Sequence, residues 1–136
     1  MSSKLSQLRN DALVALIPPV VILFIHSLRV ATLPGLYQAD YIMHFSGGLS
    51  IAWMAMILWN RFRAHGWIPK NNPLWLRNLT VWGSVALVGV GWELFEYIMS
   101  NRFNFAMQFT IGETMGDLAL DLAGGLAFLV LFRFRD

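Results

Sequence analysis

The chain has 136 residues, of which 57% are hydrophobic and 13% are charged, with a formal net charge of +2 and no cysteine. A soluble domain of this length has too little interior to hide so much apolar surface, and the composition also excludes a disordered chain. The small net charge does not indicate a nucleic-acid partner, and the lack of cysteine excludes disulfides, thiol nucleophiles and cysteine-ligated metals.

Apolar stretches long enough to cross a bilayer recur along the chain. They cover residues 12–28, 40–60, 79–100 and 114–132, and the short connections between them predict one antiparallel bundle. Pro18 and Pro19 predict a bend in the first stretch. A basic start followed by an apolar run also describes a signal peptide, but these prolines and the closing His26 and Arg29 favour a retained helix. The predicted fold is all-α, with four transmembrane helices in a single domain, residues 1–136.

The basic residues predict the orientation of this bundle. With four spans, both termini and the connection at residues 61–77 lie on one side of the membrane. That side carries eight of the ten basic residues: Lys4, Arg9, Arg61, Arg63, Lys70, Arg77, Arg133 and Arg135. The other side, which includes a predicted loop or short interfacial helix at residues 101–113, carries Arg29 and Arg102. Because basic residues are enriched on the inner side, both termini are predicted to be cytoplasmic.

Acidic residues gather in the outer half of the predicted bundle. Glu93 and Glu96 stand three residues apart in the third span, on one helical face. Asp40 and His44 are one turn apart in the second span, and Asp117 and Asp121 are one turn apart in the fourth. With a helical rise of 1.5 Å per residue, all of these lie within about 10 Å of the outer boundary. An Asp at mid-membrane costs roughly 2.5–3.5 kcal/mol on insertion scales, so these residues need partners.

The outer half carries an excess of negative charge. Its six acids are Asp40, Glu93, Glu96, Glu113, Asp117 and Asp121, against only Arg29 and Arg102. Crowded carboxylates either take up protons or recruit cations. Carboxylates with an imidazole suit zinc, manganese or iron, whereas oxygen ligands alone suit magnesium or calcium. The predicted metal ligands are Asp40, His44, Glu93, Glu96, Asp117 and Asp121, and the expected cofactor is zinc, manganese or magnesium.

Simpler interpretations exist for several of these residues. Glu93 and Glu96 are also explained by hydrogen bonds between helices. Asp40 fits the N-cap of the second helix, and Asp117 fits a first-turn acid favoured by the helix dipole. Capping does not explain His44 and Asp121, which lie deeper. His26 is interpreted as a histidine that packs within the bundle, and His65 as a solvated residue of the connection.

Glycines lie just below the level of the acids. They are Gly47, Gly48, Gly89, Gly124 and Gly125, each three or four residues from His44, Glu93 or Asp121. Small residues allow helix backbones to approach closely in a membrane. The helical faces that carry the acids are therefore predicted to be faces that pack closely.

Three motifs resemble those of small bacterial membrane proteins of the VanZ-like and YjdF-like families. They are Asp40-x-x-x-His44-Phe45, Glu93-x-x-Glu96 and Asp117-x-x-x-Asp121-x-x-Gly124-Gly125, so the resemblance covers about residues 40–125. VanZ-like proteins usually place Gln near the Glu and Arg before the last motif, where this chain has Glu96 and Gly116. The resemblance implies a multi-pass protein of the bacterial inner (plasma) membrane with a role in the cell envelope.

Two functional hypotheses follow. In the first, the outer carboxylate and histidine cluster binds a cation, a lipid head group or a helix of a partner membrane protein. In the second, a membrane-embedded, metal-dependent hydrolase cleaves a lipid phosphoester at the outer face. Glu93 or Glu96 would then accept a proton, and Arg29 or Arg102 would bind phosphate. The first is favoured because the sequence contains no complete reaction motif. An ion conduit is disfavoured because the inner half has no matching acid.

Overall fold

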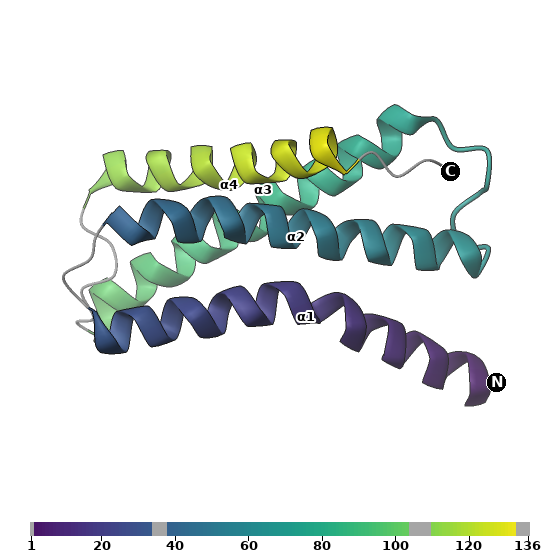
Figure 1. Ribbon diagram of the computed structural model, residues 1–136, viewed down its shortest axis with the longest axis horizontal. Coiled ribbons are helices and arrows are strands. Elements are labelled where there is room, and N and C mark those ends of the chain that lie inside the picture. The colour runs from purple at the N-terminus through teal and green to yellow at the C-terminus, as the bar shows by residue number, and fades with distance from the viewer. Residues whose placement is uncertain (1, 34–37, 104–109, 133–136) are drawn as a thin grey trace.

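The computed structural model describes residues 2–33, 38–103 and 110–132, and this part of the chain forms four helices and no strand (Figure 1). The helices are α1 (Ser2–Thr32), α2 (Gln38–Ala64), α3 (Leu74–Phe103) and α4 (Ile111–Leu131). Consecutive helices run in opposite directions, so α1 begins and α4 ends at the same end of the bundle as the α2–α3 connection (Figure 1). The all-α, antiparallel prediction is confirmed.

Helix α2 is the centre of the bundle. It packs against all three other helices. Within the described residues, the backbone of α1 approaches only α2, whereas α4 packs against α2 and α3. The buried apolar core therefore lies among α2, α3 and α4, at Ala52, Met56, Val81, Val85 and Phe128.

In the described part of the chain, three helices are long and apolar enough to cross a membrane: Ser6–Arg29 of α1, Ala39–Ala64 of α2, and Ile111–Leu131 of α4. Large apolar side chains cover the outside of the bundle; Phe24 is 67% exposed and Leu87 76% exposed. In water this surface would be costly, whereas in a bilayer it faces hydrocarbon. Helix α3 is also long, with 30 residues, and it contains the charged residues Arg77, Glu93, Glu96 and Arg102. Its crossing of the membrane stays a prediction.

Most of the helices are longer than the apolar stretches from which they were predicted. Helix α1 begins at Ser2 instead of residue 12, and it continues through Pro18 and Pro19 with a change of direction along its length (Figure 1). Helix α3 runs on to Phe103 and α4 begins at Ile111, so residues 101–103 and 111–113 of the predicted loop or interfacial helix belong to these two helices. Residues 104–109 lie outside the described part. Helical hydrogen bonds continue past the ends of the apolar stretches, because the backbone pattern does not require apolar side chains.

The starts of α2 and α4 correct two predictions about capping. Helix α4 begins with a capping box: Thr110 Oγ1 accepts from the Glu113 N–H at 3.1 Å, and Glu113 Oε2 accepts from the Thr110 N–H at 2.9 Å. Glu113 is thus the first-turn acid, and Asp117 lies beyond the first turn. Asp40 lies inside the first turn of α2, which starts at Gln38, so it is not the N-cap. Capping therefore accounts for neither Asp40 nor Asp117.

Glycines allow α2 and α4 to pack backbone against backbone. A Cβ atom added to Gly48 would overlap the backbone carbonyl of Asp121, and one added to Gly124 would overlap the carbonyl oxygen of Phe45. On α3, a Cβ added to Gly89 would lie 2.9 Å from Asp121 Oδ2. The close packing predicted from the glycines is confirmed. Two of these glycines, Gly48 and Gly89, lie against Asp121.

We expect Gly48→Ala and Gly124→Ala each to destabilise the protein by about 1–3 kcal/mol or more, because the added methyl group has no room between two backbones. Thermal unfolding in detergent measures the change. Gly116→Ala is the matched control on α4: no atom lies within 4 Å of its added Cβ, and replacing an exposed helical glycine should stabilise by about 0.5–1 kcal/mol. Equal melting of Gly116→Ala and Gly124→Ala would contradict the packing described here.

Candidate functional site

His44 is the central residue of the cluster that the sequence predicts in the outer half of the bundle. We name it the outer cluster after that prediction, and it consists of Asp40, His44, Glu93, Glu96, Asp117 and Asp121. The His44 side chain is 6% exposed and lies between two carboxylates of α4. His44 Nε2 is 3.8 Å from Asp117 Oδ2, and His44 Nδ1 is 3.5 Å from Asp121 Oδ1. Asp117 and Asp121 are four residues apart, which puts both on the face of α4 that packs against α2. Each ring nitrogen of His44 therefore faces its own carboxylate.

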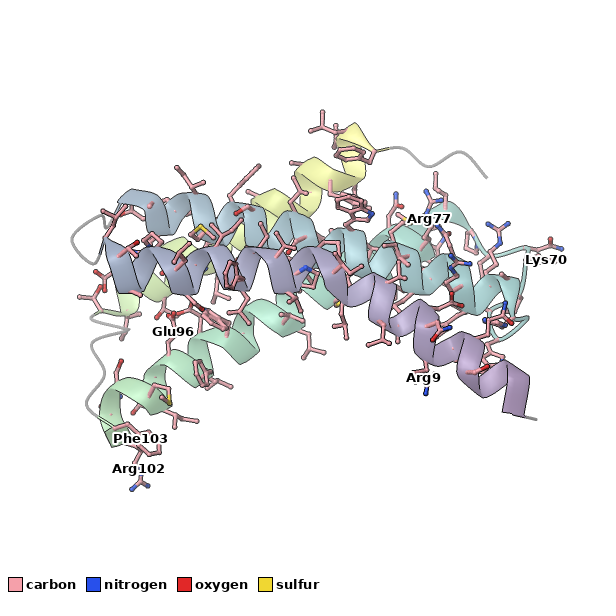
Figure 2. All side chains as sticks on the ribbon, turned by 60° about the horizontal axis from the view of Figure 1, so that its bottom comes forward. Arg9, Lys70, Arg77, Glu96, Arg102 and Phe103 are labelled. Atoms are coloured by element: carbon pink, nitrogen blue, oxygen red, sulfur yellow. The ribbon has the colours of Figure 1, made fainter. Side chains whose placement is uncertain are left out.

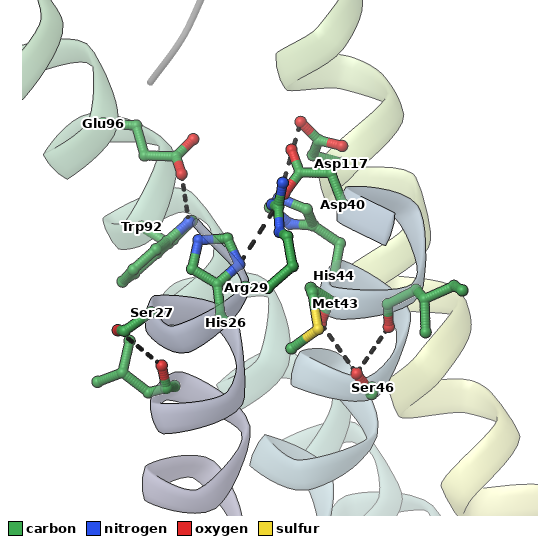
Figure 3. Close-up of polar contacts among 12 residues, drawn as sticks. His26, Ser27, Arg29, Asp40, Met43, His44, Ser46, Trp92, Glu96 and Asp117 are labelled. Carbon is green, nitrogen blue, oxygen red and sulfur yellow. Dashed lines mark hydrogen bonds and ion pairs between the residues drawn. The ribbon is translucent and has the colours of Figure 1, made fainter. Parts of the chain in front are cut away.

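Asp40 joins the end of α1 that carries Arg29 to the start of α2. It lies one turn before His44 on α2, and its carboxylate accepts a hydrogen bond from the Arg29 guanidinium of α1 (Figure 3). His26 Nδ1 approaches the same Asp40 oxygen at 3.9 Å. Asp40, His44 and Asp117 can each offer one ligand atom, and these atoms lie within 4.8 Å of one another. Three side chains from two helices thus have ligand atoms close enough together to hold one metal ion.

Glu93 and Glu96 approach the cluster from α3. Their side chains are buried, at 5% and 6% exposure, and both lie close enough to the cluster to interact electrostatically with its members. The Trp92 indole N–H donates to Glu96 Oε1 at 2.9 Å (Figure 3). The Trp92 ring also meets the edge of His26, with ring centroids 6.0 Å apart. Trp92 therefore links Glu96 on α3 to His26 on α1.

The predicted site residues fall into three groups. Asp40, His44 and Asp117 have ligand atoms within 4.8 Å of one another, and Asp121 lies 3.5 Å from Nδ1 of His44. Glu93 and Glu96 are buried on α3. Arg29 reaches the cluster by its ion pair with Asp40. Arg102 is exposed at the end of α3 and points away from the bundle (Figure 2). The roles of these residues as ligands or catalytic groups stay predictions.

Two neighbours of the cluster were not recognised as site residues from the sequence. His26 was interpreted only as a packing histidine, and Trp92 was not singled out. The sequence contains one indication for each residue, because Trp92 precedes Glu96 by four residues and His26 precedes Arg29 by three. Residues at these spacings are neighbours on one face of a helix. Such spacing marks the same helical face, although it does not show that the two faces meet.

A second polar group joins α1 and α2 at the opposite end of the bundle. Asp11 of α1 lies 3.4 Å from Arg61 Nε and 3.3 Å from His65 Nε2. The His65 side chain is only 17% exposed, so the prediction of a solvated His65 is wrong. It is covered because α1 starts at Ser2 and its first turns lie alongside the end of α2.

The model of the family described as "Predicted membrane protein (DUF2238)" matches residues 20–136. The chain belongs to this family. The DUF2238 match includes every residue of the outer cluster, from Asp40 to Asp121, and also His26 and Arg29. It agrees with the apolar helices in indicating a multi-pass membrane protein. No curated protein and no solved structure matches this DUF2238 chain.

We expect Trp92→Phe to destabilise the protein by about 1–3 kcal/mol, because a buried carboxyl oxygen of Glu96 loses its indole donor while the aromatic contact with His26 is largely kept. Thermal unfolding in detergent is the measurement. Trp75→Phe is the control: Trp75 is 65% exposed, and its replacement should stay within about 0.5 kcal/mol of the parent. If Trp92→Phe melts like Trp75→Phe, the Trp92–Glu96 hydrogen bond does not stabilise the fold.

Proposed function

We propose that this DUF2238 protein binds a divalent cation at its outer cluster, with Asp40, His44 and Asp117 as ligands. The observation that carries the proposal is the group of three ligand atoms within 4.8 Å of one another, contributed by two helices whose backbones are in contact. Asp40 and His44 are one turn apart on α2, so close packing against α4 brings in Asp117 as the third ligand.

The distances suit a first-row metal after a small contraction. Zinc bonds to histidine nitrogen and carboxylate oxygen at about 2.0–2.2 Å, which places two ligand atoms of one ion about 3–3.5 Å apart. His44 Nε2 and Asp117 Oδ2 are 3.8 Å apart, only slightly wider. Two carboxylates and one imidazole favour zinc or manganese over magnesium.

Asp121 lies on the side of His44 opposite Asp117, and its position supports His44 as a metal ligand. It approaches Nδ1 at 3.5 Å, while Nε2 faces Asp117. A carboxylate on the second ring nitrogen is the usual way in which proteins orient a metal-binding histidine and raise its basicity. We therefore assign Asp121 to orientation of His44 and Nε2 of His44 to the cation.

The charges near the cluster favour the same conclusion. Arg29 provides one positive charge for Asp40, but Glu93, Glu96, Asp117 and Asp121 are all buried around His44. Removing several carboxylates from water is costly unless positive charge or protons compensate. A divalent cation at the centre of the group would provide that compensation.

The uneven distribution of basic residues supports an outer location for the cluster and cytoplasmic termini. The VanZ-like and YjdF-like resemblance of the three motifs supports a bacterial inner membrane and a role in the cell envelope. We therefore place the proposed cation site at the outer leaflet of that membrane, where a lipid head group or a partner membrane protein would meet it.

The alternative is a metal-dependent hydrolase that acts on a lipid phosphoester. It is favoured by the burial of Glu93 beside Asp117, where a carboxylate could accept a proton from water. Of the two arginines expected to bind phosphate, Arg29 is paired with Asp40 and Arg102 points away from the bundle. Cation binding without catalysis is therefore the better-supported proposal.

Elemental analysis of the purified protein should find about one zinc or manganese ion per chain. His44→Ala and Asp117→Asn should lose it, whereas His65→Ala, at the other end of the bundle, should retain it. Asp121→Asn should weaken metal affinity by about 10–100-fold, as expected for a carboxylate that orients a ligand.

Chelation provides a second readout of the same proposal. Removing the cation should lower the melting temperature of the parent protein, because the buried carboxylates lose their compensating charge. Glu93→Gln should keep the fold and show a smaller response, since the amide is similar in size and uncharged. Melting that is insensitive to chelators, in protein free of metal, would remove both the cation site and the hydrolase.

Reporter fusions test the proposed orientation. Fusions at residue 136 and within residues 70–72 should report the cytoplasm, and a fusion at Phe103 should report the external side, because eight basic residues lie on the side predicted to be inner. A cytoplasmic signal at Phe103 would overturn the orientation and place the cluster at the inner face.

A further inference from the structure

A cavity of about 230 Å³ lies against the inner side of the outer cluster, among α1, α2 and α3. Its polar lining residues include His26, His44 and Asp121, which belong to the cluster or contact it, and also Ser50 and Trp92. Most of the remaining wall is apolar and includes Leu23 and Val88. The cavity therefore has a polar end beside the cluster and an apolar body deeper along the helices.

The wall between α1 and α3 is not closed by helix packing. Within the described ranges, α1 packs against α2 and makes no backbone approach to α3, and His26 and Trp92 bridge the two helices through their side chains. In Figure 2 the end of α3 that carries Glu96 and Phe103 diverges from α1. Leu23 and Val88 line the cavity and are still 46% and 41% exposed, so the cavity continues to the outer surface of the bundle.

We propose that this cavity holds one hydrocarbon chain of an outer-leaflet lipid, which enters sideways between α1 and α3. The medium outside an opening at this depth is lipid, and an apolar lining excludes water more readily than hydrocarbon. Size supports a single chain: cavities of about 150 Å³ bind benzene, whereas sites for drug-sized ligands occupy about 300–1,000 Å³.

The polar end determines which way the chain lies. An outer-leaflet lipid has its ester and head group toward the outer boundary and its chain end toward the midplane. That orientation matches the cavity, in which His26 and His44 lie at the outer end and the apolar wall extends inward. The ligand class is thus an amphiphile whose polar part lies next to the outer cluster. Retention of the chain rests on apolar contact and does not require the proposed cation.

Native mass spectrometry tests this with delipidated protein in detergent and added phosphatidylcholine of one defined mass. We expect a complex with one bound lipid that survives removal of the detergent. Leu23→Trp and Val88→Trp should lower the bound fraction by about tenfold or more, because an indole displaces several methylenes from the apolar site.

Matched controls exist on the same helices. Ile25 and Val90 are 46% and 47% exposed, and both lie outside the cavity lining. Ile25→Trp and Val90→Trp should retain the lipid, with unchanged helical circular dichroism and gel-filtration profiles. In parallel, a phosphatidylcholine with a diazirine in the middle of its chain should label residues 19–26 and 85–92 in the parent protein, and this labelling should fall in Leu23→Trp.

The proposal is overturned if no discrete lipid complex forms, or if the control variants lose the lipid as completely as Leu23→Trp and Val88→Trp. It is also overturned if chelation alone releases the lipid, because retention would then depend on the head group and the cation. Retention of the lipid by metal-free protein would support the chain site even if the proposed cation site failed, so the two proposals are separable.

Discussion

The direct backbone contact between α2 and α4 is the constraint on which the outer cluster depends. Gly48 leaves room for the carbonyl of Asp121, and Gly124 leaves room for the carbonyl of Phe45. A methyl group at either position would force the helices apart, and His44 would no longer lie between Asp117 and Asp121. In a membrane, where lipid removes most of the hydrophobic drive for helices to associate, such close contact is the main source of dispersion energy. The packing motif and the candidate site are therefore one structural feature.

Helix α1 is attached to this closely packed unit in a different way. Within the described residues, its backbone approaches only α2, and its contact with α3 is made by the side chains of His26 and Trp92. Polar pairs join α1 and α2 at both ends: Arg29 with Asp40 at one end, and Asp11 with Arg61 and His65 at the other. Between these ends α1 presents apolar side chains, many of them exposed. Ion pairs at the two ends hold α1 in place without filling the space between α1 and α3, and the cavity occupies that space.

His44 and Asp121 of the outer cluster line the cavity, as does His26, which contacts the cluster. The polar cluster and the apolar cavity are therefore adjacent along the length of the helices. A polar site followed by an apolar one matches the order of chemical groups in a lipid, from head group to chain. Combined with the proposed cation, it describes a place where an outer-leaflet lipid would present its polar part to buried carboxylates. Trp92 and His26 lie at the junction, where the indole also orients Glu96.

The amino-acid sequence by itself determined the helices, their antiparallel order, and the common level of the acids, because hydrophobic length and helical rise depend only on position along the chain. The glycine positions also indicated which faces pack closely. Only the tertiary structure decided that Asp40 and Asp117 are not caps, that both nitrogens of His44 face carboxylates, and that Arg102 points away. It also decided the contacts of Trp92 and His26. The physical reason is that periodicity specifies the face and height of a residue, whereas its partner depends on helix rotation and on which helices touch. In this chain, glycine contacts determine how α2 and α4 pack, and ion pairs at the two ends of α1 determine how it packs on α2. Both join residues that are distant in the sequence.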